Sequence, residues 1–462
     1  MRILFLFLLA SLSAAAQKQL ASTKTNLHKG EHHHKAFMAS DTANSQVAVY
    51  IADKEKLKVL RYNSAVFFTD SLVTKRPARE FLGMEGYSFN GQRATVYWGD
   101  QWLNKIEAVD FDLGTKNVTK KQFKFTYGKN EDRLITFSEN NSFYLLTLLP
   151  KGQLRFSIFN GTQYVDKVAD FSPFHIVGAD NKKTSLNYLI KEYGLQKIDT
   201  KTYNALMDAG SKIKFYVLPD RMLLTLDNNP EFTQVFTIDP ETFEVTEANT
   251  PQTGYEKGAT ANSFYFEGKL YRILLKKDAI RLSAALPETG NEMKSYTARK
   301  NEAITFKNTP LYTERGVGAK ASEIESTEKF LKKAGDEGAA IAVYGTPDEL
   351  LVTAGATRII KPFEQGIITT MIMGEDVDPE DYEDIRTTYF ESVFDGNFGH
   401  IEGALSPLAI DFINDYSAKV KGWTSMRAII PFKDYYILGY YNKIAKSYVL
   451  EKYTDGSLIP TK

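Results

Sequence analysis

The stretch Asp112-Leu113-Gly114-Thr115-Lys116-Asn117-Val118 has counterparts at Asp199-Thr200-Lys201-Thr202-Tyr203-Asn204-Ala205 and at Asp239-Pro240-Glu241-Thr242-Phe243-Glu244-Val245. In each stretch a threonine follows the aspartate by three positions, an apolar residue comes three positions later, and another apolar residue precedes the aspartate. The starts are 87 residues apart (112 to 199) and 40 apart (199 to 239), about two units and one unit. Internal repeats of this length are typical of propellers and solenoids.

Looser versions of the turn extend the repeat. Asn63, Asn160 and Pro287 stand at the same place after an apolar run, which gives turn anchors at about 63, 112, 160, 199, 239 and 286. The gaps of 49, 48, 39, 40 and 47 residues match the ~40 to 50 residues of a four-stranded blade. With a final unit in 426–458 and a diluted one between 290 and 425, the pattern predicts seven or eight units.

Short apolar runs broken by Gly, Pro, Asn and Asp predict antiparallel hairpins. Examples are 46–52, 142–149 and 222–226, and the 30 Phe and 26 Tyr residues also favour strands. The sequence therefore predicts an all-β fold, a seven- or eight-bladed β-propeller with a small helical insertion. The competing architectures are a β-solenoid and a pair of β-sandwiches. We expect Phe37–Ser40 to complete the blade formed by 426–458.

Helix signals concentrate in one region. They are Ser326–Ala334, a start at Asp378-Pro379, and a segment from Ser406 to about Lys421. Runs such as 340–344, 350–353 and 366–373 in the same region can supply one more blade. The propeller is expected to span 37–462, with the helical insertion within about 307–425.

The N-terminus has the pattern of an export signal. Met1-Arg2 is followed by an apolar run from Ile3 to Ala10 and by Ala14-Ala15-Ala16 before Gln17. We expect a signal peptide over 1–16 and a flexible, polar leader over 17–36. The chain is then exported to the periplasm or the extracellular space.

Composition excludes several classes of protein. The chain has no cysteine, so it holds no disulfide. Lys+Arg and Asp+Glu both number 57, a balance that argues against a dedicated nucleic-acid binder. The sequence predicts no membrane span, no cofactor and a monomer.

The phrase apolar-Asp-Pro-Glu-Thr-x-x-apolar at 238–245 resembles the strand-turn-strand hairpin of secreted β-propeller repeat proteins. In its export signal, which ends before Gln17, and in its absence of cysteine, the chain resembles secreted proteins of an uncharacterised Bacteroidota family. The resemblance implies a propeller fold and leaves the activity open.

Two segments carry candidate ligand-binding residues. Trp98, Asp100 and Trp102 form an aromatic turn whose rings can stack on a sugar or a peptide side chain. The alternative is that the tryptophans fill the space between blades. Asp395, His400 and Glu402 lie in a glycine-rich loop and can act as general acid and base. The alternative is a plain surface loop.

Two further clusters suggest metal ions and fail on spacing. Glu31-His32-His33-His34 matches no metal-ligand pattern. The acidic run 375–384 fits no EF-hand frame and is better explained as the acidic start of a helix. We therefore predict no metal site and assign no catalytic residue.

The functional prediction is a secreted binding or scaffold module for a protein or glycan ligand. The alternative is a carbohydrate-active hydrolase or lyase with its site in the propeller funnel, so the sequence leaves enzyme activity open. Fold alone does not choose between the two.

Overall fold

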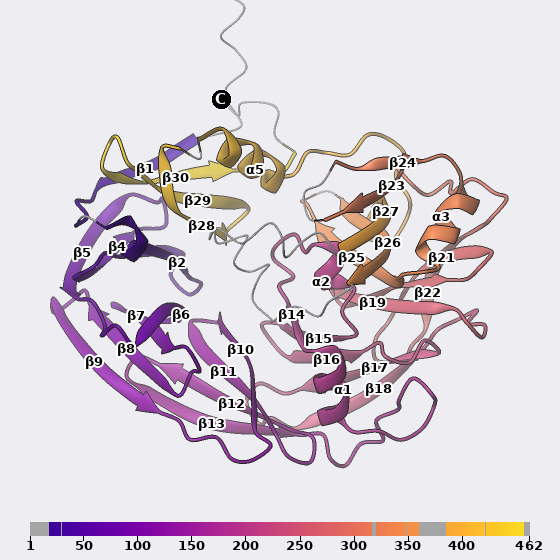
Figure 1. Cartoon of the computed structure of the whole chain (residues 1–462), viewed down its shortest axis with the longest axis horizontal. Coiled ribbons are helices and arrows are strands. Elements are labelled where there is room, and N and C mark those ends of the chain that lie inside the picture. The colour runs from indigo at the N-terminus through magenta and orange to yellow at the C-terminus, as the bar shows by residue number, and fades with distance from the viewer. Residues whose placement is uncertain are drawn as a thin grey trace, which may run out of the picture.

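The computed structural model describes residues 18–28, 30–316, 320–347, 349–359, 385–420 and 422–456. Within these residues 30 strands form seven sheets, numbered I to VII in the order in which they succeed one another around a ring (Figure 1). The expected signal peptide 1–16, the expected strand 366–373 and the acidic run 375–384 with its helix start lie outside the described residues.

Each sheet is antiparallel, except that β14 runs parallel to β15. From the centre of the ring outward, sheet I contains β2 (Lys35–Asp41), β3 (Gln46–Ala52), β4 (Lys56–Tyr62) and β5 (Phe68–Lys75). Sheet II contains β6 (Phe81–Asn90), β7 (Arg93–Asp100), β8 (Lys105–Asp112) and β9 (Asn117–Lys124). Sheet III contains β10 (Asp132–Glu139), β11 (Ser142–Leu149), β12 (Gln153–Asn160) and β13 (Gln163–Asp170).

Sheets IV and V are β14 (Gln196–Ile198), β15 (Ile213–Val217), β16 (Met222–Leu226), β17 (Phe232–Ile238) and β18 (Val245–Pro251); and β19 (Thr260–Phe266), β20 (Lys269–Leu275), β21 (Ala279–Ala285) and β22 (Glu292–Arg299). Sheets VI and VII are β25 (Gly338–Gly345), β26 (Leu350–Ile359), β27 (Ile385–Phe394), β23 (Leu311–Arg315) and β24 (Ser322–Ile324); and β28 (Thr424–Phe432), β29 (Tyr435–Asn442), β30 (Ser447–Tyr453) and β1 (Lys18–Lys24). The helices are η1 (Glu31–His33), α1 (Leu186–Tyr193), α2 (Leu206–Ala209), α3 (Thr327–Ala334) and α5 (Ala409–Val420).

Apolar clusters lie between neighbouring sheets. Val59 and Trp98 belong to the cluster between sheets I and II. Leu60 and Leu450 belong to the one between sheets I and VII, where β2 also lies against β28. The second strand of a sheet is thus covered on both faces, which is why β3 and β11 are nearly continuous apolar runs.

The hairpin turns fall at two opposite ends of the strands. The turns that lead into the outermost strand of sheets I to V define the upper rim: 63–67, 113–116, 161–162, 239–244 and 286–291. Second-to-third-strand turns define the lower rim: 53–55, 101–104, 150–152 and 443–446. Five of the six sequence anchors mark upper-rim turns in sheets I, II, III, IV and V, so the repeat does report successive sheets.

The anchor at Asp199 was wrong. Its Oδ1 accepts a hydrogen bond from the N–H of Lys201 at 3.0 Å, as Asp239 Oδ1 does from Glu241 at 2.9 Å. Asp199, however, comes after β14 and leads toward the short helix α2 instead of into a returning strand. The interval from 160 to 239 is therefore one enlarged unit, sheet IV with its helices, because an aspartate-capped turn can lead into either a strand or a helix.

The region expected to be flexible at 17–36 contains a strand, so that expectation was wrong. β1 pairs antiparallel with β30 as the outermost strand of sheet VII. Phe37–Ser40 belong to β2 and pair with β3 of sheet I, so β1 and not β2 completes the C-terminal sheet. The polar composition of β1 gave no strand signal, because an outermost strand has little apolar surface to bury.

A chain that begins at residue 26 should be destabilised by on the order of 3 kcal/mol relative to one that begins at residue 18, because each lost pairing bond costs about 1 kcal/mol and the strand is mostly exposed. Urea denaturation measures the loss, and hydrogen exchange by mass spectrometry should show faster exchange in β30. Unchanged exchange in β30 would contradict the pairing.

The region from 307 to 425 contains sheet VI, in which the expected strand runs 340–344 and 350–353 form β25 and β26. β23 and β24 precede α3 in sequence but form the outer edge, and β27 lies between β23 and β26. The expected helices at 326–334 and 406–421 are confirmed as α3 and α5, with Ser326 Oγ accepting the N–H of Lys329 at 3.3 Å. Helices α1 and α2 were not predicted. Among the described residues, none of these helices has the length and apolar character needed to span a bilayer.

Candidate functional site

The two predicted tryptophans do not form one aromatic surface. Trp98 lies on β7 and is fully buried between sheets I and II, so its ring cannot stack on a ligand. Trp102 lies in the lower-rim turn after β7 and is 60% exposed. Asp100 ends β7, and its Oδ1 accepts the N–H of Lys105 at 3.2 Å, which holds that turn.

The Trp102 turn is braced by the segment that comes after β9. Tyr127 Oη donates to the Leu103 carbonyl at 2.9 Å, and the N–H of Phe125 donates to the Asn104 carbonyl at 2.8 Å. The Arg133 guanidinium lies 4.9 Å from the centre of the half-buried Tyr127 ring. Its Nη1 is 3.5 Å from Asn104 Oδ1. We call Trp102, Asn104, Tyr127 and Arg133 the Trp102 platform.

The platform combines an exposed indole with polar groups on a braced turn. Indole rings pack against the apolar faces of ligands, and guanidinium and amide groups supply directed hydrogen bonds. Trp102 was predicted from the sequence, but Asn104, Tyr127 and Arg133 were not. Only Asn104 is close enough in sequence to have been included.

The loop with Asp395, His400 and Glu402 lies away from the centre of the ring. The N–H of His400 donates to Tyr296 Oη at 2.9 Å, and its Nε2 is 3.0 Å from Asn308 Oδ1. Tyr296 belongs to β22, the outermost strand of sheet V. Asp395 Oδ1 accepts the N–H groups of Asn397 and Gly399, and these bonds lower the pKa of its carboxyl.

The three side chains of this loop have different surroundings. Burial lowers the pKa of His400, while Glu402 is exposed. Phe398, in the same loop, is buried and its ring centre lies 4.3 Å from that of Phe394. The loop is therefore a packed connection against sheet V, and it brings no acid and base together in a central funnel.

Residues 196–210, the central segment, contact sheets on several sides of the ring. Lys201 Nζ is 2.5 Å from Glu139 Oε1 of β10 in sheet III. The N–H of Tyr203 donates to Tyr436 Oη of sheet VII at 3.3 Å, and its ring packs edge-on against Tyr344 of sheet VI. Figure 1 shows β14 and α2 on the inside of the ring. The protein's own chain therefore occupies the middle of the fold.

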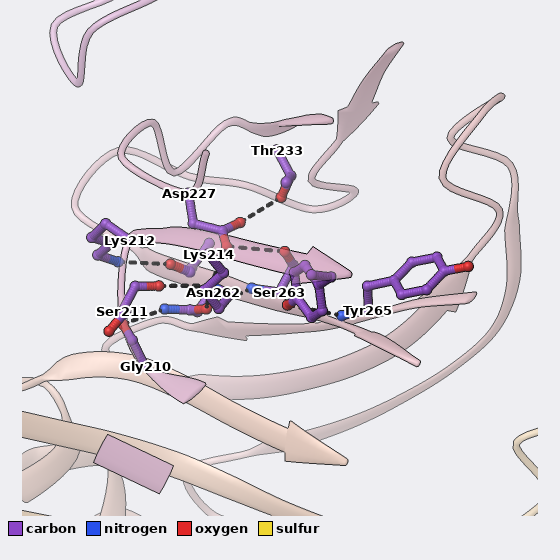
Figure 2. A network of polar contacts seen from close by, with 11 residues as sticks. Gly210, Ser211, Lys212, Lys214, Asp227, Thr233, Asn262, Ser263 and Tyr265 are labelled. Atoms are coloured by element: carbon purple, nitrogen blue, oxygen red, sulfur yellow. Dashed lines mark hydrogen bonds and ion pairs between the residues drawn. The ribbon is translucent and has the colours of Figure 1, made fainter. Parts of the chain in front are cut away.

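A buried polar network holds the end of the central segment (Figure 2). Lys214 is completely buried on β15, and its Nζ donates to Asp227 Oδ2 at 2.6 Å, to Asn262 Oδ1 at 2.8 Å and to the Ser211 carbonyl at 2.6 Å. Asn262 Nδ2 donates in turn to the Gly210 carbonyl at 2.7 Å. The network thus joins sheets IV and V to the last residue of the central segment.

Every polar atom at the centre of this network has a protein partner. Asp227 also accepts from Thr233 Oγ1 at 2.6 Å and from Ser263 Oγ at 3.0 Å. Burial lowers the pKa of Lys214, and the Asp227 carboxylate opposes that shift. A fully used ammonium and carboxylate leave no group to bind a ligand, so the network is structural. The network was not predicted, although a lysine inside the otherwise apolar run 213–217 is a sequence feature that indicates a buried charge.

Burial also perturbs a carboxyl on sheet VI. It raises the pKa of Glu391 on β27 to about 7, with nearby Asp411 and Glu314 acting in the same direction and Thr353 opposing them. Among the described residues, no group of three or more His, Asp or Glu side chains is placed to hold a metal ion.

Comparison with protein-family models gives no match, and neither does comparison with curated proteins. Solved structures similar to the chain include the WD40 domain of SCAP from fission yeast, with 8% identity, coverage of 96% of this chain and 98% of that chain, and a TM-score of 0.31. The SapL1 lectin in complex with alpha methyl fucoside has 11% identity, coverage of 80% and 95%, and a TM-score of 0.25. A structure from a study of two prolyl endopeptidases has 9% identity and a TM-score of 0.36, and the similarity covers 92% of this chain and 50% of that one. Likenesses this weak carry no conclusion about function.

Proposed function

We propose that the chain is an exported, closed, seven-bladed β-propeller that binds a protein or carbohydrate ligand, and that the Trp102 platform is its binding site. The observation that carries the proposal is the exposed Trp102 ring on a turn that Phe125 and Tyr127 hold by hydrogen bonds. Trp102 lies on the same turn as Asn104, whose amide contacts the Arg133 guanidinium, and an indole together with such polar groups is suited to a sugar, so carbohydrate is the favoured ligand.

Two features support the closed and exported form. The apolar cluster between sheets I and VII, together with β1, packs the first and last sheets against each other. The first strand begins at Lys18, so cleavage before Gln17 would leave it whole. The proposed location is the periplasm or the extracellular space, and the proposed state is a monomer.

Trp102→Ala should lower affinity for the ligand about tenfold or more, because a buried aromatic anchor commonly contributes at least 1 to 2 kcal/mol of binding energy. The probes are soluble starch, xylan, mannan and pectin, tested by affinity electrophoresis. Tryptophan fluorescence of a Trp423→Phe variant then reports on Trp102, since the chain has 3 Trp and Trp98 is buried.

Phe67→Ala is the matched control for this experiment. Phe67 is 65% exposed but lies in an upper-rim turn, so its loss should leave the affinity unchanged. Equal affinity of wild type and Trp102→Ala for a bound polysaccharide would reject the platform as the site. If none of the four polysaccharides binds, the carbohydrate form of the proposal fails and a protein ligand remains.

The alternative, a carbohydrate-active hydrolase or lyase, now rests on Glu391. A carboxyl with a pKa of about 7 is suited to proton transfer near neutral pH. The central segment argues against this alternative, because Tyr203 contacts Tyr436 and Tyr344 and lies close enough to Glu391 to interact with it electrostatically. Turnover of a polysaccharide that Glu391→Gln abolishes would favour the enzyme.

A further inference from the structure

Two apolar side chains project from the lower rim at sheet VII. Ile444 is 77% exposed and Trp423 is 62% exposed. The N–H of Lys443 donates to the Trp423 carbonyl at 3.0 Å, so the two residues lie on adjacent backbone segments. We call them the Trp423–Ile444 tip.

The backbone holds Ile444 in this exposed position. It lies in the hairpin turn between β29 and β30. There Asn442 Oδ1 accepts the N–H of Ile444 at 3.0 Å and that of Ala445 at 2.8 Å. A turn capped in this way does not fold its apolar side chain back onto the protein. A single exposed apolar side chain is common, but Ile444 and Trp423 are exposed on adjacent backbone segments, and apolar surface gathered at one place marks interaction sites.

Lysines surround the tip. Lys24 Nζ donates to the Ala445 carbonyl at 2.8 Å, and the Lys446 carbonyl accepts the N–H of Thr25 at 3.0 Å. Lys443 belongs to the same turn and Lys419 to the last turn of α5, just before Trp423. The acidic partner in this set is Glu31, whose Oε2 lies 2.7 Å from Lys443 Nζ. Among the described residues named here, four lysines outnumber one glutamate, so this set carries net positive charge.

We propose that the Trp423–Ile444 tip binds the surface of an anionic lipid membrane. Trp423 and Ile444 are both largely exposed and lie on adjacent backbone segments, and two large apolar side chains placed in this way suit insertion into a deformable lipid interface. Tryptophan prefers that interface, and lysines beside an apolar tip are attracted to anionic head groups. Binding of this kind requires no spanning helix, and it does not depend on the ligand proposed for Trp102.

Vesicle sedimentation tests the proposal with the full chain from residue 17. Vesicles of phosphatidylcholine with phosphatidylglycerol should bind at least about tenfold more protein than phosphatidylcholine alone, and added salt should weaken the binding. Ile444→Ser and Trp423→Ser should each lower the partition coefficient about tenfold, as expected for loss of one buried apolar side chain. In a Trp102→Phe variant, Trp423 emission should shift to shorter wavelength on addition of anionic vesicles.

Phe67→Ser is the matched control, because Phe67 is as exposed and has a lysine nearby, with Lys433 Nζ 2.7 Å from the Ser64 carbonyl, but lies on the upper rim. Its partition coefficient should equal that of the wild type, and thermal unfolding should be the same for all three variants. Equal partition into neutral and anionic vesicles, or an equal loss in Phe67→Ser, would overturn the proposal. Tip-dependent binding to poly-glutamate without binding to anionic vesicles would also overturn it and would indicate an acidic protein partner.

Discussion

Replacing Asp227 by alanine is expected to lower the free energy of unfolding by about 3 to 5 kcal/mol, the cost of leaving one partner of a buried ion pair uncompensated. Lys214 has no exposed surface, so its ammonium cannot reach water when the carboxylate is removed. The hydroxyls of Thr233 and Ser263 lose the same acceptor. Such a loss is a large fraction of the stability of a typical domain. Urea denaturation followed by circular dichroism measures it.

A double-mutant cycle distinguishes the ion pair from general damage to the core. Lys214→Met alone leaves the Asp227 carboxylate buried without its charged partner. The combined Lys214→Met and Asp227→Leu variant removes both charges, so neither is left unpaired. We therefore expect the double variant to be less destabilised than the sum of the single variants by at least about 1 kcal/mol. Strictly additive losses would show that the two charges do not stabilise each other in the fold.

The same variants test the link between this network and the central segment. Asn262 bonds both Lys214 Nζ and the Gly210 carbonyl, so movement of the lysine should release the end of that segment. Hydrogen exchange at 205–210 should increase in Asp227→Ala before global unfolding. If hydrogen exchange in Asp227→Ala increases only in the strands that carry the network, the network does not stabilise the central segment.

The runs 46–52, 142–149 and 222–226 were predicted as strands and form β3, β11 and β16, because their signals are local. The turns at Asp112 and Asp239 each place an aspartate carboxylate under backbone N–H groups, and a strand returns after each. Asp199 has the same local bond without the returning strand. Its different outcome depends on where the chain goes next, which a seven-residue pattern does not encode. β1 was missed for a related reason, since its partner β30 lies at the opposite end of the chain.

In the candidate site, too, local sequence signals predicted some features, and others depend on the tertiary fold. Trp98 and Trp102 are four positions apart, yet one is buried in the strand and the other exposed in the turn, a difference decided by the end of β7. The residues that complete the Trp102 platform, Tyr127 and Arg133, come from a later segment. Lys214 and Asn262 lie 48 positions apart and meet only because sheets IV and V are neighbours. Contacts of this kind require the tertiary fold.

Glu337→Gln is expected to stabilise the protein at alkaline pH and to have little effect near pH 4.5. Glu337 lies between α3 and β25, and its side chain has no exposed surface. Within the part of the chain that the structure describes, neither carboxyl oxygen has a hydrogen-bond partner. Burial raises the pKa of this carboxyl from 4.5 to about 7, while Thr388 and Arg386 oppose the shift only in part. The Arg386 Nε is 3.9 Å away and is itself partly exposed.

The direction of the pH effect is set by the raised pKa. Below about pH 4.5 the Glu337 carboxyl is protonated in both the folded and the unfolded chain, so its titration does not lower the stability of the fold. As the pH rises toward 7 the unfolded chain releases its proton while the folded chain retains it, so the folded state loses stability. Above pH 7 the cost reaches about 3 kcal/mol, because one pKa unit corresponds to about 1.4 kcal/mol. Glutamine keeps the shape of the side chain and removes the titration.

The informative quantity is the difference in unfolding free energy between Glu337→Gln and wild type, measured from pH 4.5 to 8.5. Asp208 and Glu391 also have a pKa raised to about 7, so the wild-type curve alone contains more than one titration. Subtraction cancels those shared contributions, and Asp208→Asn gives an independent curve for a carboxyl on α2. A difference that stays constant across this range would mean that Glu337 finds a partner or water in solution. A difference that grows by about 3 kcal/mol would place an uncompensated carboxyl beneath α3, at the point where the chain order of sheet VI departs from that of the other sheets.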